Sequence, residues 1–182
     1  DLHSGFAGEH ASNLGGILAH HIAQPHSLPS YIVDPVVVDE LEPVARFSGI
    51  PELPRVSIFH ALNQKATARR AAAEMGKAYE EVRFIVAHLG GGITVGAHDR
   101  GRVIDVNDGL NGEGPFSTER SGGVAALKIL ELVTKRGYTE AQVKKMIKGE
   151  GGLVAYCGSN NAEELSGCID EGDNEVRLVM EA

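Results

Sequence analysis

Apolar residues recur along the chain with two different periods, and these periods predict both strands and helices. Short apolar runs predict three consecutive strands at 81–88, 93–98 and 102–107. Residues 99–101 read Asp-Arg-Gly and predict a tight turn between the second and third strands. Because helical patterns lie before and after these strands, the sequence indicates an α/β or α+β protein.

Longer segments with a period near 3.6 residues predict the helices. They lie at 12–22, at 36–49, at 54–76, after residue 123, from residue 139 and through the acidic C-terminal stretch. The segment at 54–76 has the clearest pattern, because Pro54 stands near its start and Gly76 ends it. Thr139 and Gln142 have the spacing of a capping box, which predicts a helix start at that point.

Three consecutive glycines, Gly90, Gly91 and Gly92, separate the first two predicted strands. Glycine motifs of dinucleotide-binding folds and P-loops lie between a strand and a helix, so the order of elements excludes both here. Two alternatives are left. The glycines form a nest of backbone N–H groups that phosphate oxygens can approach, or they form a wide turn without a ligand. The flanking His88 and Thr94 favour the ligand.

Composition and charge narrow the possible partners. The 182 residues are 42% hydrophobic and 23% charged, as in folded globular proteins, and the formal net charge is −8. The 17 Lys and Arg residues form no continuous block, so we expect no nucleic acid partner. No apolar run approaches the roughly 20 residues that cross a bilayer, and no membrane partner is expected. Cys157 and Cys168 are too few for a disulfide framework and indicate a reducing cytoplasm.

Five motifs together resemble the butyrate kinases of the acetate kinase group. They occur in the family's order and are HASNLGG from His10, SYIVDPVVVDE from Ser30, SIFHALNQKA from Ser57, HLGGGITVGAH from His88 and DGLNGEGPFSTERSGG from Asp108. The group is part of the actin-like ATPase superfamily. The resemblance implies a two-domain, ribonuclease-H-like α/β fold with the active site in the cleft between the domains.

The same resemblance implies how this chain divides. Residues 1–80 would form the C-terminal part of the first, acyl-substrate domain with a connecting helix, and residues 81–182 the N-terminal part of the second, nucleotide domain. The chain begins at Asp1 and ends in the amphipathic VRLVMEA, so we expect a piece of a longer protein. The implied reaction converts ATP and butyrate into ADP and butyryl phosphate. Mg²⁺ ligands are expected outside this chain, and the complete protein is expected to be a homo-oligomer.

Arg120 is the strongest catalytic candidate. A fatty acid carboxylate is already ionised at pH 7, so transfer requires cations around the phosphoryl group more than it requires a base. A guanidinium matches the geometry of phosphate oxygens, and the glycines around Arg120 let the backbone approach a ligand. The alternative is a surface arginine paired with Glu119. We expect Arg120 to lie beside the triple-glycine turn.

His60 and Asp34 complete the predicted catalytic set. His60 is placed on the rim of the 54–76 helix, beside an apolar stripe through Phe59, Leu62 and Ala66. The family motif implies that His60 donates to the transferring phosphoryl group, and a solvated histidine is the alternative. Asp34 ends the SYIVDP segment, which predicts a short buried strand. Its alternatives are a turn-forming side chain and an active-site carboxylate that orients the substrate or acts through the metal shell.

Motif matching also implies binding residues. They are His88, Gly90, Gly91, Gly92 and Asn161 for the phosphates and nucleotide, and His10 and Asn13 for the acyl substrate. Relatives usually carry an Asp and a basic residue at the adenine site, where this chain has Asn161 and Glu163. With Glu163 in place of the basic residue, the chain lacks a cation that could stack on the adenine, so its nucleotide preference is open.

Two other functions stay open at this point. One is a kinase for another short or branched carboxylic acid. The other is a non-catalytic, truncated relative that binds a carboxylate or a partner subunit. A metal centre within the chain is not expected, because His20, His21 and His26 lack the spacing of metal ligands.

Overall fold

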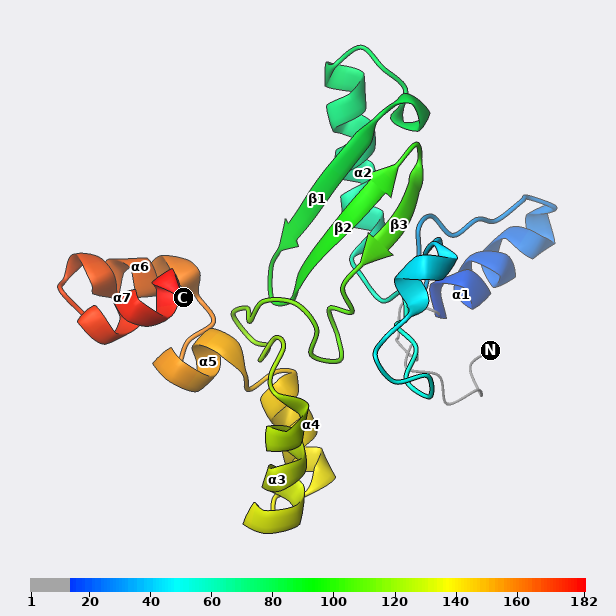
Figure 1. Cartoon of the computed structure of the whole chain (residues 1–182). Coiled ribbons are helices and arrows are strands. Elements are labelled where there is room, and N and C mark those ends of the chain that lie inside the picture. The colour runs from blue at the N-terminus through cyan, green and yellow to red at the C-terminus, as the bar shows by residue number, and fades with distance from the viewer. Residues whose placement is uncertain (1–13) are drawn as a thin grey trace. The chain divides into compact units, whose positions relative to one another are not determined.

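The computed structural model describes residues 14–182 and divides into two compact units (Figure 1). The first unit comprises the chain up to Val86 together with Gly96–Val106, and the second comprises Ala87–Val95 together with Asn107–Ala182. The division crosses the first hairpin, so its glycine tip belongs to the second unit. The predicted domain boundary at residue 80 concerns the complete protein and stays a prediction.

The three predicted strands are confirmed, and they form one sheet in the order β1-β2-β3 (Figure 1). Its strands are β1 (Arg83–Leu89), β2 (Ile93–Asp99) and β3 (Arg102–Val106). β2 and β3 are antiparallel, with Asp99 opposite Arg102 and a register shift between Ala97 and His98. The predicted turn at 99–101 is formed by Arg100 and Gly101, with φ angles of 48° and 89°, while Asp99 is the last residue of β2.

Helix α2 (Ala61–Glu74) covers the sheet, but its contact face differs from the predicted stripe. Its buried residues are Ala61, Gln64, Lys65, Ala68 and Ala72, at the i, i+3, i+4 spacing of one face. Leu62 and Ala66, which the sequence placed in the apolar stripe, are exposed. A Cβ at Gly96 would overlap Gln64 Oε1, so the glycine allows the helix to lie close to β2.

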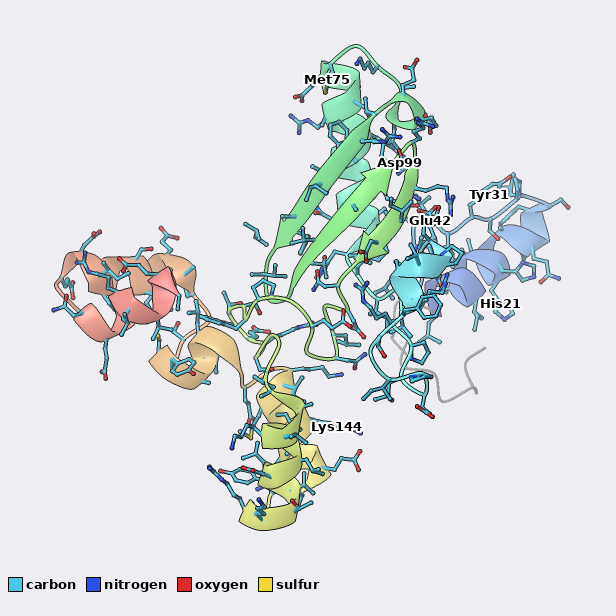
Figure 2. The ribbon with its side chains drawn as sticks, in the orientation of Figure 1. His21, Tyr31, Glu42, Met75, Asp99 and Lys144 are labelled. Carbon is cyan, nitrogen blue, oxygen red and sulfur yellow. The ribbon has the colours of Figure 1, made fainter. Side chains whose placement is uncertain are left out.

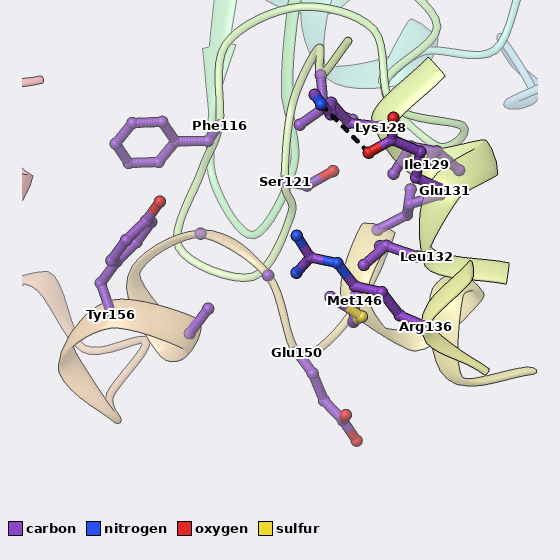
Figure 3. A pocket seen from close by; sticks show the side chains of 15 residues that line it. Phe116, Ser121, Lys128, Ile129, Glu131, Leu132, Arg136, Met146, Glu150 and Tyr156 are labelled. Carbon is purple, nitrogen blue, oxygen red and sulfur yellow. Dashed lines mark hydrogen bonds and ion pairs between the residues drawn. The ribbon is translucent and has the colours of Figure 1, made fainter. Parts of the chain in front are cut away.

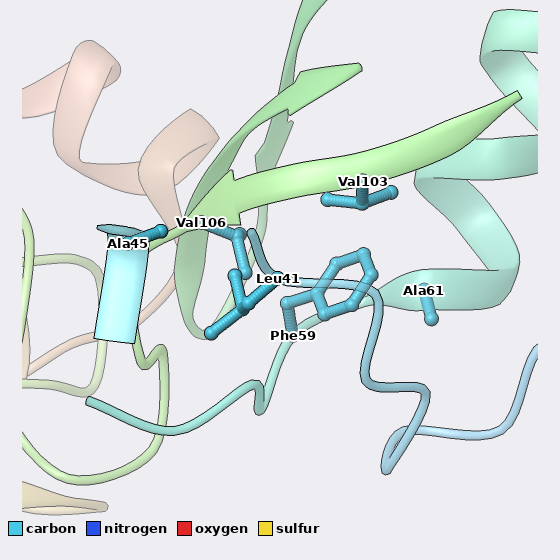
Figure 4. Close-up of a cluster of buried hydrophobic side chains, with 6 residues drawn as sticks. All are labelled: Leu41, Ala45, Phe59, Ala61, Val103 and Val106. Carbon is cyan, nitrogen blue, oxygen red and sulfur yellow. The ribbon is translucent and has the colours of Figure 1, made fainter. Parts of the chain in front are cut away.

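Two hydrophobic clusters hold the first unit together. One lies under β3 and contains Leu41, Ala45, Phe59, Ala61, Val103 and Val106 (Figure 4). The other contains Ala68, Ala72, Tyr79 and Val82, and Phe84 and Val86 of β1 pack against it. Tyr79 lies on the 3₁₀ turn Tyr79–Glu81, which connects α2 to the sheet.

Three predictions for the first unit are wrong in detail. Residues 30–35 form no strand, and Tyr31, Ile32 and Val33 are 79%, 52% and 61% exposed because no neighbouring described strand pairs with them (Figure 2). The 36–49 segment is not a helix. It contains only the 3₁₀ turn Pro43–Arg46, and its Glu42 N–H donates to Ile104 O of β3 instead of a helical carbonyl.

The third error concerns the start of α2. The predicted helix began near Pro54, whereas α2 begins at Ala61. The intervening segment is bound to its neighbours: Ser57 Oγ donates to Val38 O at 2.6 Å, and Phe59 is 2% exposed. Tertiary contacts therefore take the place of helical hydrogen bonds there. The N-terminal helix α1 (Leu14–Ala23) matches its prediction over the described residues and is followed by the 3₁₀ turn Gln24–His26.

The second unit is helical after its glycine-rich loop. Its helices are α3 (Ala126–Arg136), α4 (Glu140–Ile147), α5 (Gly152–Cys157), α6 (Ala162–Asp170) and α7 (Asn174–Glu181). The capping box is confirmed: Thr139 Oγ1 accepts from Gln142 N, and Gln142 Oε1 accepts from Thr139 N. Cys157 and Cys168 are free thiols. Within residues 14–182, no helix is long and apolar enough to cross a membrane.

Candidate phosphate-binding site

The glycine tip of the β1–β2 hairpin is hydrogen-bonded to a serine that was not among the predicted site residues. Ser117 Oγ donates to Gly91 O at 2.6 Å and accepts from Arg120 N at 3.2 Å. One hydroxyl therefore joins the triple-glycine turn to the backbone of Arg120. Gly91 itself is exposed, so its peptide group is accessible to a ligand. The position of Ser117 in FSTERSGG, three residues before the arginine, was the available signal.

Arg120 lies beside the triple-glycine turn, as expected. A Cβ built at Gly92 would come within 2.9 Å of Arg120 Cζ, so only a glycine leaves room for the guanidinium there. Arg120 Nη1 donates to Gly109 O. The half-buried guanidinium therefore has a fixed place between two glycine-rich segments.

The loop that carries Arg120 is held by its own backbone. Ser117 N donates to Arg120 O at 3.0 Å. The backbones of Arg120 and Lys148 form an isolated antiparallel β-bridge. A Cβ at Gly152 would overlap Ser117 O, and Gly152 has a φ of 59°. The start of α5 is thus packed directly against this loop, which needs a glycine for that approach.

Glu119 does not neutralise Arg120 in this arrangement. Asn160 Nδ2 donates to Glu119 Oε1 at 2.6 Å, and the other carboxylate oxygen would be 3.4 Å from a Cβ at Gly91. The ion pairs among residues 14–182 include none between Glu119 and Arg120. The surface ion pair considered as an alternative for Arg120 is therefore absent from the described chain.

His88 and a cavity border the glycines. His88 Nε2 would lie 3.0 Å from a Cβ at Gly90, and burial lowers the pKa of His88 below its usual value, which favours a neutral imidazole at pH 7. A cavity of about 890 Å³ is bordered by Gly90, Gly91, Ser117 and Asn160, among others. This volume is in the range of nucleotide and cofactor sites.

Asn161 has a structural task at the predicted adenine position. It is the N-cap of α6, and its Oδ1 accepts from Glu163 N at 3.1 Å and from Glu164 N at 3.3 Å. An Asp at this position would provide the same acceptor. The predicted role of Asn161 in nucleotide binding stays a prediction.

In the first unit, Asp34 is held by two cations from successive turns of α2. Arg69 Nη1 lies 2.7 Å from Asp34 Oδ2, and Lys65 Nζ lies 3.6 Å from Asp34 Oδ1. Lys65 is 5% exposed and also binds Glu40 Oε1 at 2.7 Å. Asp34 has a φ of 43°, unusual for a residue with a side chain. The carboxylate is thus oriented by α2, and Lys65 and Arg69 are supporting residues that sequence reasoning missed.

His60 is the N-cap of α2 and does not lie on the body of a helix. Its carbonyl accepts from Gln64 N at 2.9 Å, and its side chain is half-buried. The residue therefore lies at the positive end of the helix dipole, a position that favours an anion. The predicted substrate residues His10 and Asn13 lie outside the described residues.

Comparison with known proteins places the chain in a family. The model of the acetokinase family matches residues 54–182. The chain belongs to the acetokinase family. Over all 182 residues it is 55% identical to Butyrate kinase 2 of Clostridium acetobutylicum and covers 51% of that protein. The chain therefore spans about half the length of the curated relative it matches.

Solved structures agree on the fold. The acetate kinase of Porphyromonas gingivalis superposes with a TM-score of 0.78 at 23% identity, covering 93% of this chain and 44% of that one. A propionate kinase from Francisella tularensis gives a TM-score of 0.68 at 24% identity, covering 78% and 38%. These structures confirm that the chain is a piece of the α/β fold of the acetokinase family, an actin-like ATPase fold.

Proposed function

We propose that the protein containing this chain is a phosphotransferase that converts ATP and butyrate into ADP and butyryl phosphate. The 55% identity to Butyrate kinase 2 over the whole chain carries this proposal. The placement of Arg120 against Gly92, beside the exposed Gly91, supplies the chemistry that the reaction needs. The chain contributes part of the active site, because it spans about half of that relative.

In the proposed reaction, a carboxylate oxygen of butyrate attacks the γ-phosphorus of ATP. The bond from that phosphorus to the bridging oxygen breaks, and the oxygen leaves with ADP. Arg120 stabilises the charge on the transferring oxygens, and the peptides around Gly91 bind the phosphates. His60 and His88 donate hydrogen bonds to phosphoryl oxygens. Asp34, held by Lys65 and Arg69, orients the substrate.

The proposed cofactor is Mg²⁺ bound to ATP. Among residues 14–182, no group of three or more His, Cys, Asp or Glu side chains is placed to hold a metal ion. The glycine turn and Arg120 fit the phosphates of the nucleotide, to which Mg²⁺ would be bound. When bound, Mg²⁺ would neutralise phosphate charge, and we assign its protein ligands to segments outside this chain.

Cellular location and assembly belong to the same proposal. Two free thiols agree with a reducing compartment, so we place the kinase in the cytoplasm. We expect a homo-oligomer with no membrane or nucleic acid partner.

A hybrid enzyme tests the proposed reaction. In this hybrid kinase, the chain replaces its aligned segment in Butyrate kinase 2 of Clostridium acetobutylicum. We expect ATP-dependent formation of butyryl phosphate, trapped as the hydroxamate. The Gly92→Ala variant should lose most of this activity, because its methyl group displaces the Arg120 guanidinium. Gly167→Ala in α6 is the control, since a Cβ at Gly167 meets no atom within 4 Å.

Two outcomes would replace the proposal. If acetate or a branched acid gives a higher kcat/KM than butyrate, the chain belongs to a kinase for that acid. If the hybrid kinase folds but does not bind ATP in a calorimetric titration, the chain comes from a non-catalytic relative. Asn161, the N-cap of α6, and Glu163 in its first turn are the features that favour this second outcome.

A further inference from the structure

A second cavity in the second unit is formed by α3, α4 and α5 (Figure 3). Its volume is about 380 Å³, within the range of small-molecule sites. Most of the wall is apolar and comes from Phe116, Ile129, Leu132, Met146 and Tyr156. It shares Phe116 and Ser121 with the cavity at the glycine turn, and its remaining walls come from different segments.

One lining cation has no ion-pair partner among residues 14–182. Arg136 reaches from α3 toward Ser121 across the cavity (Figure 3). The other charged residues of the lining are in ion pairs. Lys128 Nζ lies 3.2 Å from Glu131 Oε2, and Glu150 Oε1 lies 3.3 Å from Lys145 Nζ. The guanidinium of Arg136 therefore remains available to an anionic ligand.

The surrounding segment is basic in an acidic chain. Residues 126–150 contain six Lys and Arg residues and three Glu residues, whereas the whole chain has a net charge of −8. Of these cations, Lys128 and Arg136 line the cavity. A ligand with an apolar body and one negative charge matches both features.

The cavity wall is continuous with the loop that carries Arg120. Ser121 N donates to Ile147 O at 3.1 Å, and both residues line the cavity. Gly149 N donates to Glu119 O at 2.8 Å, on the residue before Arg120. A ligand in the cavity would contact the backbone that fixes the catalytic arginine of the proposed reaction.

We propose that this cavity binds the anion of a medium-chain fatty acid, separately from the acid that is phosphorylated. The carboxylate binds Arg136, and the alkyl chain lies against Ile129, Leu132 and Met146. This site is additional to the proposed kinase function, and its ligand is longer than the proposed substrate. Binding of a longer acid would therefore affect the backbone of the loop that carries Arg120.

Calorimetric titration of the hybrid kinase with hexanoate, octanoate and decanoate tests this site. Saturating butyrate is present throughout, so that the proposed substrate site is filled. We expect the affinity to rise about fourfold for each added methylene group, because each is buried against the apolar wall. The uncharged 1-octanol should bind about tenfold more weakly than octanoate, because it lacks the charge-assisted hydrogen bond to Arg136.

Three variants assign the binding to the cavity. Arg136→Met should weaken octanoate binding about tenfold, and Ala155→Trp should abolish it by filling the space. Lys144→Met is the matched control, because Lys144 pairs with Glu140 and does not line the cavity. Equal octanoate affinity in the parent, Arg136→Met and Ala155→Trp proteins would overturn the proposal. The titration measures octanoate binding and needs no turnover. It therefore tests this site even if the hybrid kinase does not phosphorylate butyrate.

Discussion

At the scale of single residues, the best supported new role is that of the cations that hold Asp34. Lys65 and Arg69 are one helical turn apart on α2, so their side chains reach the same carboxylate. Lys65 is buried and shared with Glu40, whose other oxygen accepts from Val103 N at 2.8 Å. The position of Asp34 thus depends on a network that extends to β3.

Replacing Lys65 should therefore affect both stability and catalysis. In the hybrid kinase we expect Lys65→Met to lower the free energy of unfolding by about 3 kcal/mol, because Glu40 and Asp34 lose a buried partner. It should also lower kcat more than it raises KM. Arg70→Met is the control, since its exposed pair with Glu74 contributes less than about 0.5 kcal/mol. Urea denaturation and steady-state kinetics measure both effects. A Lys65 variant as stable and active as the control would contradict the role.

His98 predicts a specific dependence of stability on pH. It is 2% exposed, and burial followed by the charge of Lys65 lowers its pKa to about 4. Its ring nitrogens contact Tyr79 Oη at 2.6 Å and Gln64 Oε1 at 3.1 Å. In the unfolded chain the pKa returns to about 6.5, so the unfolded state takes up the proton first as the pH falls.

The contribution of His98 is therefore complete above pH about 6.5 and decreases as the pH falls toward about 4, by about 3 kcal/mol. Between pH 7 and 4.5, the melting temperature of the parent hybrid kinase should fall more than that of His98→Gln. Differential scanning calorimetry at several pH values measures the difference. Parallel curves for the two proteins would show that His98 does not titrate as the structure predicts.

At the scale of helices and strands, the sequence predicted the elements that local signals determine. The three strands, the turn at Arg100 and Gly101 and the capping box at Thr139 were correct because alternation, turn residues and caps act over a few neighbours. The triple-glycine turn and the adjacent Arg120 were also anticipated, through the family motifs. The strands, the turn and the cap need no information from distant parts of the chain, whereas the contact between Gly92 and Arg120 was anticipated only through the family motifs.

Elements determined by distant contacts were not predictable. The segment before α2 has a helical pattern but is not a helix, because Ser57 Oγ donates to Val38 O and Phe59 packs in the cluster under β3. The apolar run at 30–35 suggested a strand, but a strand needs a partner that local sequence does not reveal. Lys65 was overlooked for the same reason, since its partners are 25 and 31 residues away.

The start of α5 provides a test at this scale. Gly152→Ala should lower the free energy of unfolding of the hybrid kinase by about 3 kcal/mol, because the methyl group overlaps Ser117 O and the φ of 59° disfavours a side chain. Activity should fall as well, since Ser117 holds the Arg120 loop. Gly167→Ala in α6 is the control and should stabilise by up to about 1 kcal/mol. Chemical denaturation distinguishes the two outcomes.

At the scale of the whole molecule, the chain spans about half of its curated relative. We predict that the 182-residue chain alone forms no butyryl phosphate in a coupled assay, whereas the hybrid kinase does. We also expect low stability and a tendency to aggregate, because large apolar side chains such as Tyr31, Phe47 and Leu178 are 79%, 79% and 70% exposed. Normal turnover by the isolated chain, or a cooperative and reversible thermal transition, would contradict these expectations.

The most direct test of the proposed chemistry is chemical rescue of an arginine variant. The Arg120→Ala hybrid kinase should have a kcat about 10³-fold lower than the parent, and added guanidinium chloride should restore part of the rate, because it occupies the space beside Gly92. We expect this rescue, and we expect the Arg120→Ala and parent enzymes to have the same melting temperature. An Arg120→Ala enzyme that retains the parent's kcat would contradict the proposed role of the arginine.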